Sequence, residues 1–272
     1  MSVPIGFIGA GKMAEALIAG VLRAGLAGAD GVIASDVSAA RREAVAALGV
    51  QTVAENARVL AFARAVVLAI KPQQAAAVLD EVRPHVRPDH LIVSIMAGVP
   101  TRAIEARLPA GTRVVRVMPN TACLVGAAAS GVAAGAHATA EDVRWVLELF
   151  GAVGRAEAVD ERLLDAVTGL SGSGPAYIFT VIEALADGGV AEGLPRETAL
   201  ALAAQTVMGA GRMVLESGEH PAVLRDRVTS PAGTTAEGLA VLEAHGVRNA
   251  FAQAVRAAAR RSRALGEGTS PA

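Results

Sequence analysis

The hydrophobic and polar positions follow two different patterns, one in each half of the chain. In the first half, short apolar runs alternate with stretches whose apolar residues recur at helical spacing. The runs predict strands at Val32–Ala34, Val66–Ile70, Leu91–Ile95 and Val114–Met118, after a first strand that starts at Ile5. An unbroken apolar pentad is typical of a parallel strand covered on both faces. The alternation therefore predicts an α/β fold with an N-terminal Rossmann-type, doubly wound, mostly parallel sheet.

The second half predicts helices only. After one last strand within residues 151–157, long alanine-rich patterns follow at Leu163–Val167, Pro175–Ala191, Pro195–Glu216 and Ala236–Leu265. Several of them begin with proline, which helices tolerate in their first turn. We expect an α/β domain over residues 1–160, an all-α C-terminal domain over residues 161–266 and a flexible tail over residues 267–272.

A glycine-rich turn follows the first predicted strand, where Gly9, Gly11 and Ala14 form the pattern G-x-G-x-x-A. Gly9 allows a sharp turn, Gly11 leaves room for a pyrophosphate, and Ala14 lets the next helix pack closely on the sheet. The N-terminus of that helix offers free N–H groups and the positive end of a dipole to phosphates. The pattern favours a dinucleotide-binding domain, although an ordinary strand-to-helix turn also fits these glycines.

Further candidate contacts lie at the carboxyl ends of the predicted strands, where ligands of doubly wound sheets bind. Asp36 ends the second strand, at the position that grips a ribose 2'-hydroxyl in such folds. Asn56 begins a helix and is either a plain N-cap or a ribose ligand. The predicted cofactor-binding residues are Gly9, Ala10, Gly11, Lys12, Met13, Ser35, Asp36, Asn56, Ala69, Lys71, Pro72, Ala97 and Asn120.

Composition excludes several classes of partner. The 272 residues include 25 Lys+Arg and 26 Asp+Glu, so broad attraction to nucleic acid or to an anionic membrane is not expected. A single cysteine, Cys123, excludes an intrachain disulfide and a cysteine-based metal cluster, and suits a reducing cytoplasm. We see neither a signal peptide nor a strongly apolar stretch of spanning length. These features predict a cytoplasmic protein with a small-molecule partner.

Several isolated residues could have either a functional or a purely structural role. Lys12 and Lys71 are the only lysines, and each is either a compact charge beside phosphate or nicotinamide or an accidental surface lysine. The five histidines lack the spacing of metal ligands, so a solvated or capping role is expected for each, and no metal site is predicted. Cys123 is expected to be buried filler rather than a reactive thiol.

Two segments interrupt the helical pattern of the second half. Leu170–Tyr177, LSGSGPAY, has too many glycines and serines for a helix interior, so it predicts a close backbone approach or a loop over a ligand. Val228–Gly238, VTSPAGTTAEG, gathers four hydroxyl side chains just before a helix. Such a loop forms an anion-binding concavity suited to a carboxylate, unless its hydroxyls merely cap the helix.

These residues resemble a known family. DAVTGLSGSGPAY, followed about fifty residues later by LRDRVTSPAGTTAEGL, is similar to the signature of the pyrroline-5-carboxylate reductases. The likeness covers nearly the whole chain, including FIGAGKMAEAL, AIKPQ, RVMPNTACLVG and SGEHP. It departs at Ala232, among other positions, where many relatives have a second glycine; the alanine is expected to stiffen the loop.

The resemblance implies an NAD(P)H-dependent oxidoreductase that reduces the C=N bond of 1-pyrroline-5-carboxylate to L-proline, the last step of proline biosynthesis. It implies substrate contacts at Ser230, Gly233, Thr234, Thr235 and Glu161, with the Thr235 hydroxyl oriented toward the imine nitrogen. Glu161 can equally be a solvated glutamate at a helix start. The family also implies that residues 161–266 form a dimerisation and substrate domain, in a homodimer or larger homo-oligomer with the active site near the subunit interface.

Cofactor choice and two other functions stay open. Asp36 would bond a free 2'-hydroxyl and repel a 2'-phosphate, which favours NADH, while Arg41 and Arg42 could compensate; we expect dual use with a preference for NADH. One alternative is a related dehydrogenase of small hydroxy or imino acids, which normally needs a lysine or histidine proton donor in its helical domain. The other is a non-catalytic nucleotide-binding redox regulator, which has no need of the VTSPAGTT segment.

Overall fold

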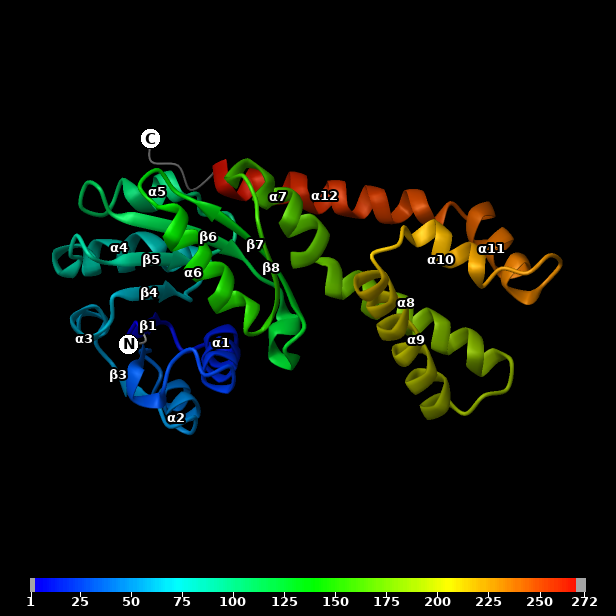
Figure 1. Ribbon diagram of the computed structural model, residues 1–272, viewed down its shortest axis with the longest axis horizontal. Coiled ribbons are helices and arrows are strands. Elements are labelled where there is room, and N and C mark those ends of the chain that lie inside the picture. The colour runs from blue at the N-terminus through cyan, green and yellow to red at the C-terminus, as the bar shows by residue number, and fades with distance from the viewer. Residues whose placement is uncertain (1–2, 268–272) are drawn as a thin grey trace. The chain divides into compact units, whose positions relative to one another are not determined.

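The first half of the chain folds around one eight-stranded sheet, in the order β3-β2-β1-β4-β5-β6-β7-β8. The computed structural model describes residues 3–267 (Figure 1). Neighbouring strands in this range run parallel, except that β6 and β7 are antiparallel. The doubly wound, mostly parallel sheet is therefore confirmed. Its strands are β1 Ile5–Ile8, β2 Val32–Ser35, β3 Gln51–Val53, β4 Ala65–Leu68, β5 Leu91–Ser94, β6 Arg113–Met118, β7 Ala128–Ala134 and β8 Gly154–Ala158.

Helices cover both faces of the sheet, which explains why the central strands are apolar throughout. Phe7 packs with α1 and α6 in one buried cluster, whereas its neighbour Ile8 packs with α3 and α4 in a second cluster. Successive strand residues point to opposite faces, so an unbroken apolar run supplies both clusters. The helices of the first half are α1 Lys12–Arg23, α2 Ala39–Ala46, α3 Asn56–Phe62, α4 Ala75–Val82, α5 Thr101–Glu105, α6 Ala140–Gly151 and α7 Leu164–Val167.

Two strands lie where the hydrophobic pattern predicted none. β3 is an edge strand with the sequence QTV, and only its last residue, Val53, is buried. β7 has the sequence AASGVAA, and five of its seven residues are buried. Small residues pack well beneath α7 here, since a Cβ on Gly131 would lie 3.0 Å from Val167. Because neither strand carries a run of large apolar side chains, periodicity alone did not reveal them.

The second half is helical. Its helices are α8 Gly174–Ala191, α9 Arg196–Ser217, α10 Pro221–Arg227, α11 Thr234–Ala244 and α12 Val247–Glu267. The single helix predicted over Ala236–Leu265 is wrong, because the chain breaks between α11 and α12 at Gly246, whose φ of 64° ends a helix readily. Of the two alternatives for Leu170–Tyr177, a close backbone approach or a loop over a ligand, the loop is wrong. Residues Thr168–Gly172 form a π-helical turn that leads into α8, and Gly172 approaches Met118 so closely that a Cβ would lie 2.7 Å from its methyl carbon.

The described chain divides into two compact units, residues 3–173 with 256–267, and residues 174–255. The first contains the sheet, and the second contains α8 to α11, where Ala186, Ala199 and Ala203 form a small buried cluster between α8 and α9. The domain limits expected at residues 160 and 266 stay predictions, and residues 268–272 of the predicted tail lie outside the described range. One helix among residues 3–267, α9, is long and apolar enough to cross a membrane, and only 11% of its most apolar window is buried.

Candidate functional site

A pocket of about 210 Å³ lies at the carboxyl edge of the sheet, where β1, β2 and β4 end. More than half of the predicted cofactor contacts line it: Gly9, Gly11, Ser35, Asp36, Asn56, Ala69 and Lys71. The pocket is also lined by residues that no sequence pattern predicted as contacts: Ile8, Val37, Ile70, Gln74 and Val78. Gln74 and Val78 follow Lys71 at helical spacing, a signal that could have identified them. The topology therefore brings three separate loops to one pocket.

The glycine turn has the geometry that its pattern predicts. Gly9 has a φ of 95°, and a Cβ there would lie 2.5 Å from the carbonyl oxygen of Ala69. At Gly11, by contrast, an added Cβ would meet no described atom within 4 Å, so the backbone faces open space. Gly11 is the N-cap of α1, and no described side chain caps that helix. The first N–H groups of α1 are thus available to an anion in the pocket.

The Asp36 carboxylate accepts hydrogen bonds from two backbone amides, one of them in the glycine turn. Its Oδ2 accepts from the amide of Ala10 at 2.8 Å, and its Oδ1 accepts from the amide of Ser38 at 2.9 Å. These bonds fix the carboxylate beside Gly9 and Gly11, at the end of β2. Each oxygen retains a second lone pair, so the carboxylate can still accept from a ribose hydroxyl.

Arg41 and Arg42 have different surroundings. The Nε of Arg41 donates to the carbonyl of Ala10 at 2.8 Å, and its guanidinium pairs with Glu15 at 2.7 Å. The hydrogen bond from the Arg41 guanidinium to Glu15 is the main reason why the pKa of the Glu15 carboxyl is lowered. Arg42 donates to the carbonyl of Asp36 at 2.7 Å and has no ion pair among the described residues. Arg42 is therefore the cation that is available near the end of β2.

Asn56 belongs to a chain of polar contacts on the pocket wall. Its Oδ1 accepts from the hydroxyl of Ser35 at 2.7 Å, and its Nδ2 donates to Glu81 at 3.1 Å. The N-cap of α3 is Glu55 rather than Asn56. The alternative that Asn56 is a plain N-cap is therefore wrong. Its side-chain amide instead contacts Ser35, the last residue of β2 and the neighbour of Asp36.

The other predicted cofactor residues do not line this pocket. Lys12 is exposed and pairs with Glu15 at 3.2 Å, while Met13 lies against the thiol of Cys123 at 3.0 Å. Asn120 is buried, where its amide donates to the carbonyl of Ser171 and accepts from the amides of Ala122 and Ala129. Ala10, Pro72 and Ala97 also lie outside the pocket lining. The roles assigned to these residues stay predictions.

The hydroxyl-rich segment of the second unit ends at an uncapped helix N-terminus. Gly233 is the N-cap of α11, and no described side chain caps it. A Cβ at Gly233 would lie 2.2 Å from the Ser230 hydroxyl, so a larger residue there would displace that side chain. The amides of Ala236 and Glu237 donate to the carbonyl of Gly233. The amides of Thr234 and Thr235 donate no hydrogen bond within the described chain. The alternative that these hydroxyls merely cap the helix is wrong.

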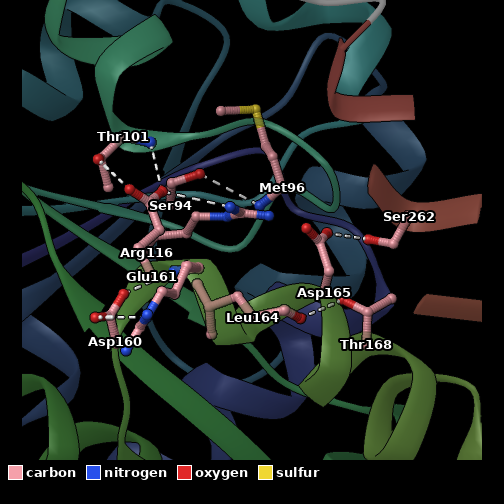
Figure 2. A network of polar contacts seen from close by, with 11 residues as sticks. Ser94, Met96, Thr101, Arg116, Asp160, Glu161, Leu164, Asp165, Thr168 and Ser262 are labelled. Atoms are coloured by element: carbon pink, nitrogen blue, oxygen red, sulfur yellow. Dashed lines mark hydrogen bonds and ion pairs between the residues drawn. The ribbon is translucent and has the colours of Figure 1, made fainter. Parts of the chain in front are cut away.

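Glu161 has partners within the first unit (Figure 2). Its carboxylate accepts from the amide of Thr101 at 2.7 Å and from the Thr101 hydroxyl at 2.7 Å. It also pairs with Arg116 at 3.3 Å. The alternative of a solvated glutamate is therefore wrong: Glu161 satisfies the N-terminus of α5. Its predicted role at the substrate remains untested.

Two of the histidines, His90 and His220, form hydrogen bonds with the backbone, and Cys123 is buried. His90 is buried rather than solvated; its Nδ1 accepts from the amide of Arg87 and its Nε2 lies 3.0 Å from the carbonyl of Leu60. His220 caps α10 by accepting from Ala222. Cys123 is buried, and burial raises the pKa of its thiol, so it is a poor nucleophile. Among the residues that the structure describes, no group of three or more His, Cys, Asp or Glu could hold a metal ion.

Comparison with protein families gives a match in each half of the chain. Residues 161–265 match the family described as pyrroline-5-carboxylate reductase dimerisation. Residues 4–98 match the family described as NADP oxidoreductase, coenzyme F420-dependent. The second match covers the strands and loops that form the pocket at the carboxyl edge.

Similar proteins extend over nearly the whole chain. A pyrroline-5-carboxylate reductase of Methanosarcina acetivorans is 52% identical over 97% of this chain and 98% of its own length. The enzyme of that name from Pisum sativum is 45% identical over 97% of this chain and 96% of its own length.

Solved structures similar to this chain come from the same family as these relatives. A pyrroline-5-carboxylate reductase from Coxiella burnetii has a TM-score of 0.93 at 36% identity, covering 97% of this chain and 99% of that one. A pyrroline carboxylate reductase from Plasmodium falciparum, solved with NADP bound, has a TM-score of 0.86 at 31% identity, covering 97% and 98%. The predicted resemblance is confirmed, and this chain belongs to the pyrroline-5-carboxylate reductase family.

Proposed function

We propose that this protein reduces 1-pyrroline-5-carboxylate to L-proline with hydride from NADH or NADPH. Hydride adds to the carbon of the C=N bond, the π electrons move to nitrogen, and a proton from the solvent completes the amine. The reaction needs an aligned hydride donor, an anion cradle and a proton source, but neither a nucleophile nor a metal. The fold, the pocket at the carboxyl edge and the identity to named relatives support this proposal.

The residues of the first unit fit a dinucleotide. The open space at Gly11 and the uncapped start of α1 suit a pyrophosphate, and the Asp36 carboxylate suits a ribose hydroxyl. Ser35 and Asn56 provide further polar groups at the same wall, and Lys71 adds a positive charge. A bound nicotinamide nucleotide supplies the hydride; the chain's part is to hold and orient it.

The single observation that carries the substrate assignment is the pair of amides at Thr234 and Thr235, which donate to no acceptor within residues 3–267. Two N–H groups at the start of an eleven-residue helix provide partial positive charge for the substrate carboxylate. The Thr235 hydroxyl then orients the imine nitrogen and relays a proton from water. A threonine hydroxyl is too weak an acid to protonate the nitrogen alone, so it acts as an orienting donor.

No lysine follows Lys71, and the two histidines of the helical half lie at helix ends, His220 as the N-cap of α10 and His245 at the end of α11, which argues against the alternative of a hydroxy-acid dehydrogenase. Reduction of a ketone normally needs such a proton donor, whereas an imine that is already protonated does not.

We also propose that a homodimer or larger homo-oligomer forms through the second unit, with the active site near the subunit interface. α8 and α9 expose Phe179, Leu185, Met208, Met213 and Leu215. Apolar side chains exposed in this number are typical of a protein interface. Because α9 lies within the residues that match the dimerisation family, a partner subunit rather than lipid is the cover that we assign to it. We place the protein in the cytoplasm, where a single unpaired thiol is stable.

The direct test is an assay with purified protein, 1-pyrroline-5-carboxylate and reduced cofactor. Loss of NADH or NADPH absorbance should require both protein and substrate, and L-proline should accumulate in equal amount. A small 2-keto acid in place of the imine should give no turnover. A folded protein that binds reduced cofactor but does not turn over the imine would refute the proposed reaction and favour the regulator.

A further inference from the structure

We propose that a second polar pocket of the first unit binds a small oxyanion, such as phosphate, sulfate or a carboxylate. This pocket has a volume of about 170 Å³. It is lined by Gly98 and Pro100 after β5, by Arg116 of β6, by Asp165 of α7 and by Arg263 of α12. It shares no lining residue with the cofactor pocket, so the two sites are distinct.

Arg116 carries the central observation. It lies in the middle of β6 and is only 5% exposed. One terminal nitrogen of its guanidinium pairs with Glu161 at 3.3 Å (Figure 2). Its Nε is fully buried and has no hydrogen-bond partner among the described residues. A buried charged donor without an acceptor is costly, and native structures seldom leave one unsatisfied. Glu161 therefore leaves part of the hydrogen-bonding capacity of Arg116 unused, and the guanidinium group borders the pocket.

The other charged side chains of the pocket include more donors than acceptors. Arg263 contributes a second guanidinium and forms no ion pair within residues 3–267. Arg102 also lines the pocket, although the proposal requires only Arg116 and Arg263. The one carboxylate of the lining, Asp165, already accepts from the Ser262 hydroxyl at 2.6 Å (Figure 2). Among the described lining residues, the guanidinium groups of Arg116 and Arg263 therefore outnumber the one carboxylate, and the pocket has an excess of positive charge.

Oxyanions suit this pocket by their charge, shape and size. Guanidinium groups present parallel N–H donors that match the oxygens of a carboxylate or phosphate. The volume of about 170 Å³ exceeds the roughly 30 Å³ that one water occupies in the liquid. The pocket therefore has room for an ion of a few non-hydrogen atoms.

Binding would connect two distant parts of the chain. Arg116 belongs to the sheet, whereas Arg263 lies near the end of α12, where Gly266 passes so close to Gly98 that a Cβ on it would lie 2.9 Å from the Gly98 carbonyl oxygen. An anion held by both guanidinium groups would fix the last turns of α12 against β6. Because only the folded protein has this pocket, the anion should stabilise that state by mass action.

The test measures thermal unfolding of the full chain in phosphate, sulfate or acetate, each against chloride at equal ionic strength and equal protein concentration. Saturating NADH is present throughout, so that the pyrophosphate site of the cofactor pocket is filled. At about ten times its dissociation constant, a bound oxyanion should raise the melting temperature by roughly 3 °C. Sulfate and phosphate also stabilise folded proteins without binding a site, so only the part of the rise that depends on Arg263 counts as binding. Such a rise in phosphate and sulfate identifies a tetrahedral oxyanion, and such a rise in acetate identifies a carboxylate.

Arg263→Gln should abolish this rise. The matched control is Arg260→Gln, which removes the same charge from an exposed position about one turn earlier in α12 and should keep the full rise. Isothermal titration with phosphate should show the same difference between the two variants. The proposal is overturned if none of the three anions stabilises the wild-type protein beyond chloride, or if Arg263→Gln responds as Arg260→Gln does. None of these readouts depends on reductase activity.

Discussion

At the scale of single residues, the Thr235 hydroxyl has the most specific chemical role that we assign. Thr235→Val keeps the shape of the side chain and removes its donor. We expect kcat to fall by roughly 10- to 100-fold, the effect of one lost hydrogen bond to the reacting group. The KM for NADH should stay unchanged, because the cofactor pocket is formed by other residues.

The control is Thr206→Val on α9, where the hydroxyl donates to the carbonyl of Leu202. It should lose far less activity than Thr235→Val. Steady-state kinetics of the two variants, with folding checked by circular dichroism, measures the difference. Equal kcat in Thr235→Val and wild type would refute the role of Thr235.

His90 predicts how stability depends on pH. Burial, and then the charge of Arg87, lower the pKa of its imidazole below the ordinary value of 6.5. The unfolded chain therefore binds a proton at a higher pH than the folded chain does. Protonation of His90 in the unfolded chain does not lower the free energy of unfolding above pH 6.5, where the imidazole is neutral in both states. As the pH falls below 6.5, the unfolded chain takes up this proton first and the folded state loses stability.

We expect His90→Gln to be less stable at neutral pH and to have a weaker loss of stability between neutral pH and pH 5.5. Urea unfolding at a series of pH values, at constant protein concentration, measures this slope. His85→Gln, at an exposed position, should keep the wild-type slope. An unchanged slope in His90→Gln would show that another group controls the acid sensitivity.

At the scale of elements, we expect the turn between β2 and α2 to decide the cofactor preference. Asp36 places a negative charge beside the glycine turn, and Arg42 is the available cation near it. A free 2'-hydroxyl can donate to Asp36, while a 2'-phosphate would be repelled. We therefore expect the protein to use both cofactors and to prefer NADH.

Asp36→Ser should raise kcat/KM for NADPH by roughly tenfold and lower it for NADH, since one unfavourable charge pair is removed. Asp30→Ser, which removes the same charge before β2, should change neither value. Kinetics with both cofactors checks this expectation. A wild-type protein that strongly prefers NADPH would contradict the assignment of Asp36.

The loop before α11 stores strain at Ala232. Its φ of 55° lies in the left-handed region that favours glycine. Ala232→Gly should relieve about 1 kcal/mol of strain and lose part of that gain to greater freedom of the unfolded chain, so stability should be equal or up to about 1 kcal/mol higher. Ala240→Gly within α11 should instead cost about 1 kcal/mol. Urea unfolding of both variants gives the comparison; destabilisation by Ala232→Gly would contradict the strain.

At the scale of the whole molecule, we expect the second unit to be stabilised by association with another subunit. Only a small cluster of alanines is buried between α8 and α9, while Phe179 is 65% exposed. Phe179→Glu should therefore shift the oligomer toward monomer by placing a charge in an apolar interface. Val125→Glu, at a 77% exposed position of the first unit, should not. Sedimentation analysis measures both, and an unchanged assembly in Phe179→Glu would exclude this face as the interface.

Local patterns in the sequence determined the elements whose causes are local. Ile5–Ile8, Ala65–Leu68 and Leu91–Ser94 are strands because their side chains are apolar on both faces, and that property is visible in the sequence. The turn at Gly9 follows from the need for a positive φ next to a strand. The specific signature around Thr235 determined the family, and with it the reaction that we propose.

The tertiary structure alone decided which distant polar groups meet. Asn56 contacts Ser35 and Glu81, and Glu161 contacts Thr101 and Arg116, across 21 to 60 positions of sequence. The antiparallel pairing of β6 with β7 and the oxyanion pocket at Arg116 likewise depend on long-range packing. Hydrophobic periodicity reports which face of an element is buried, but the partner of a polar side chain depends on how separate elements pack, and that information is not local.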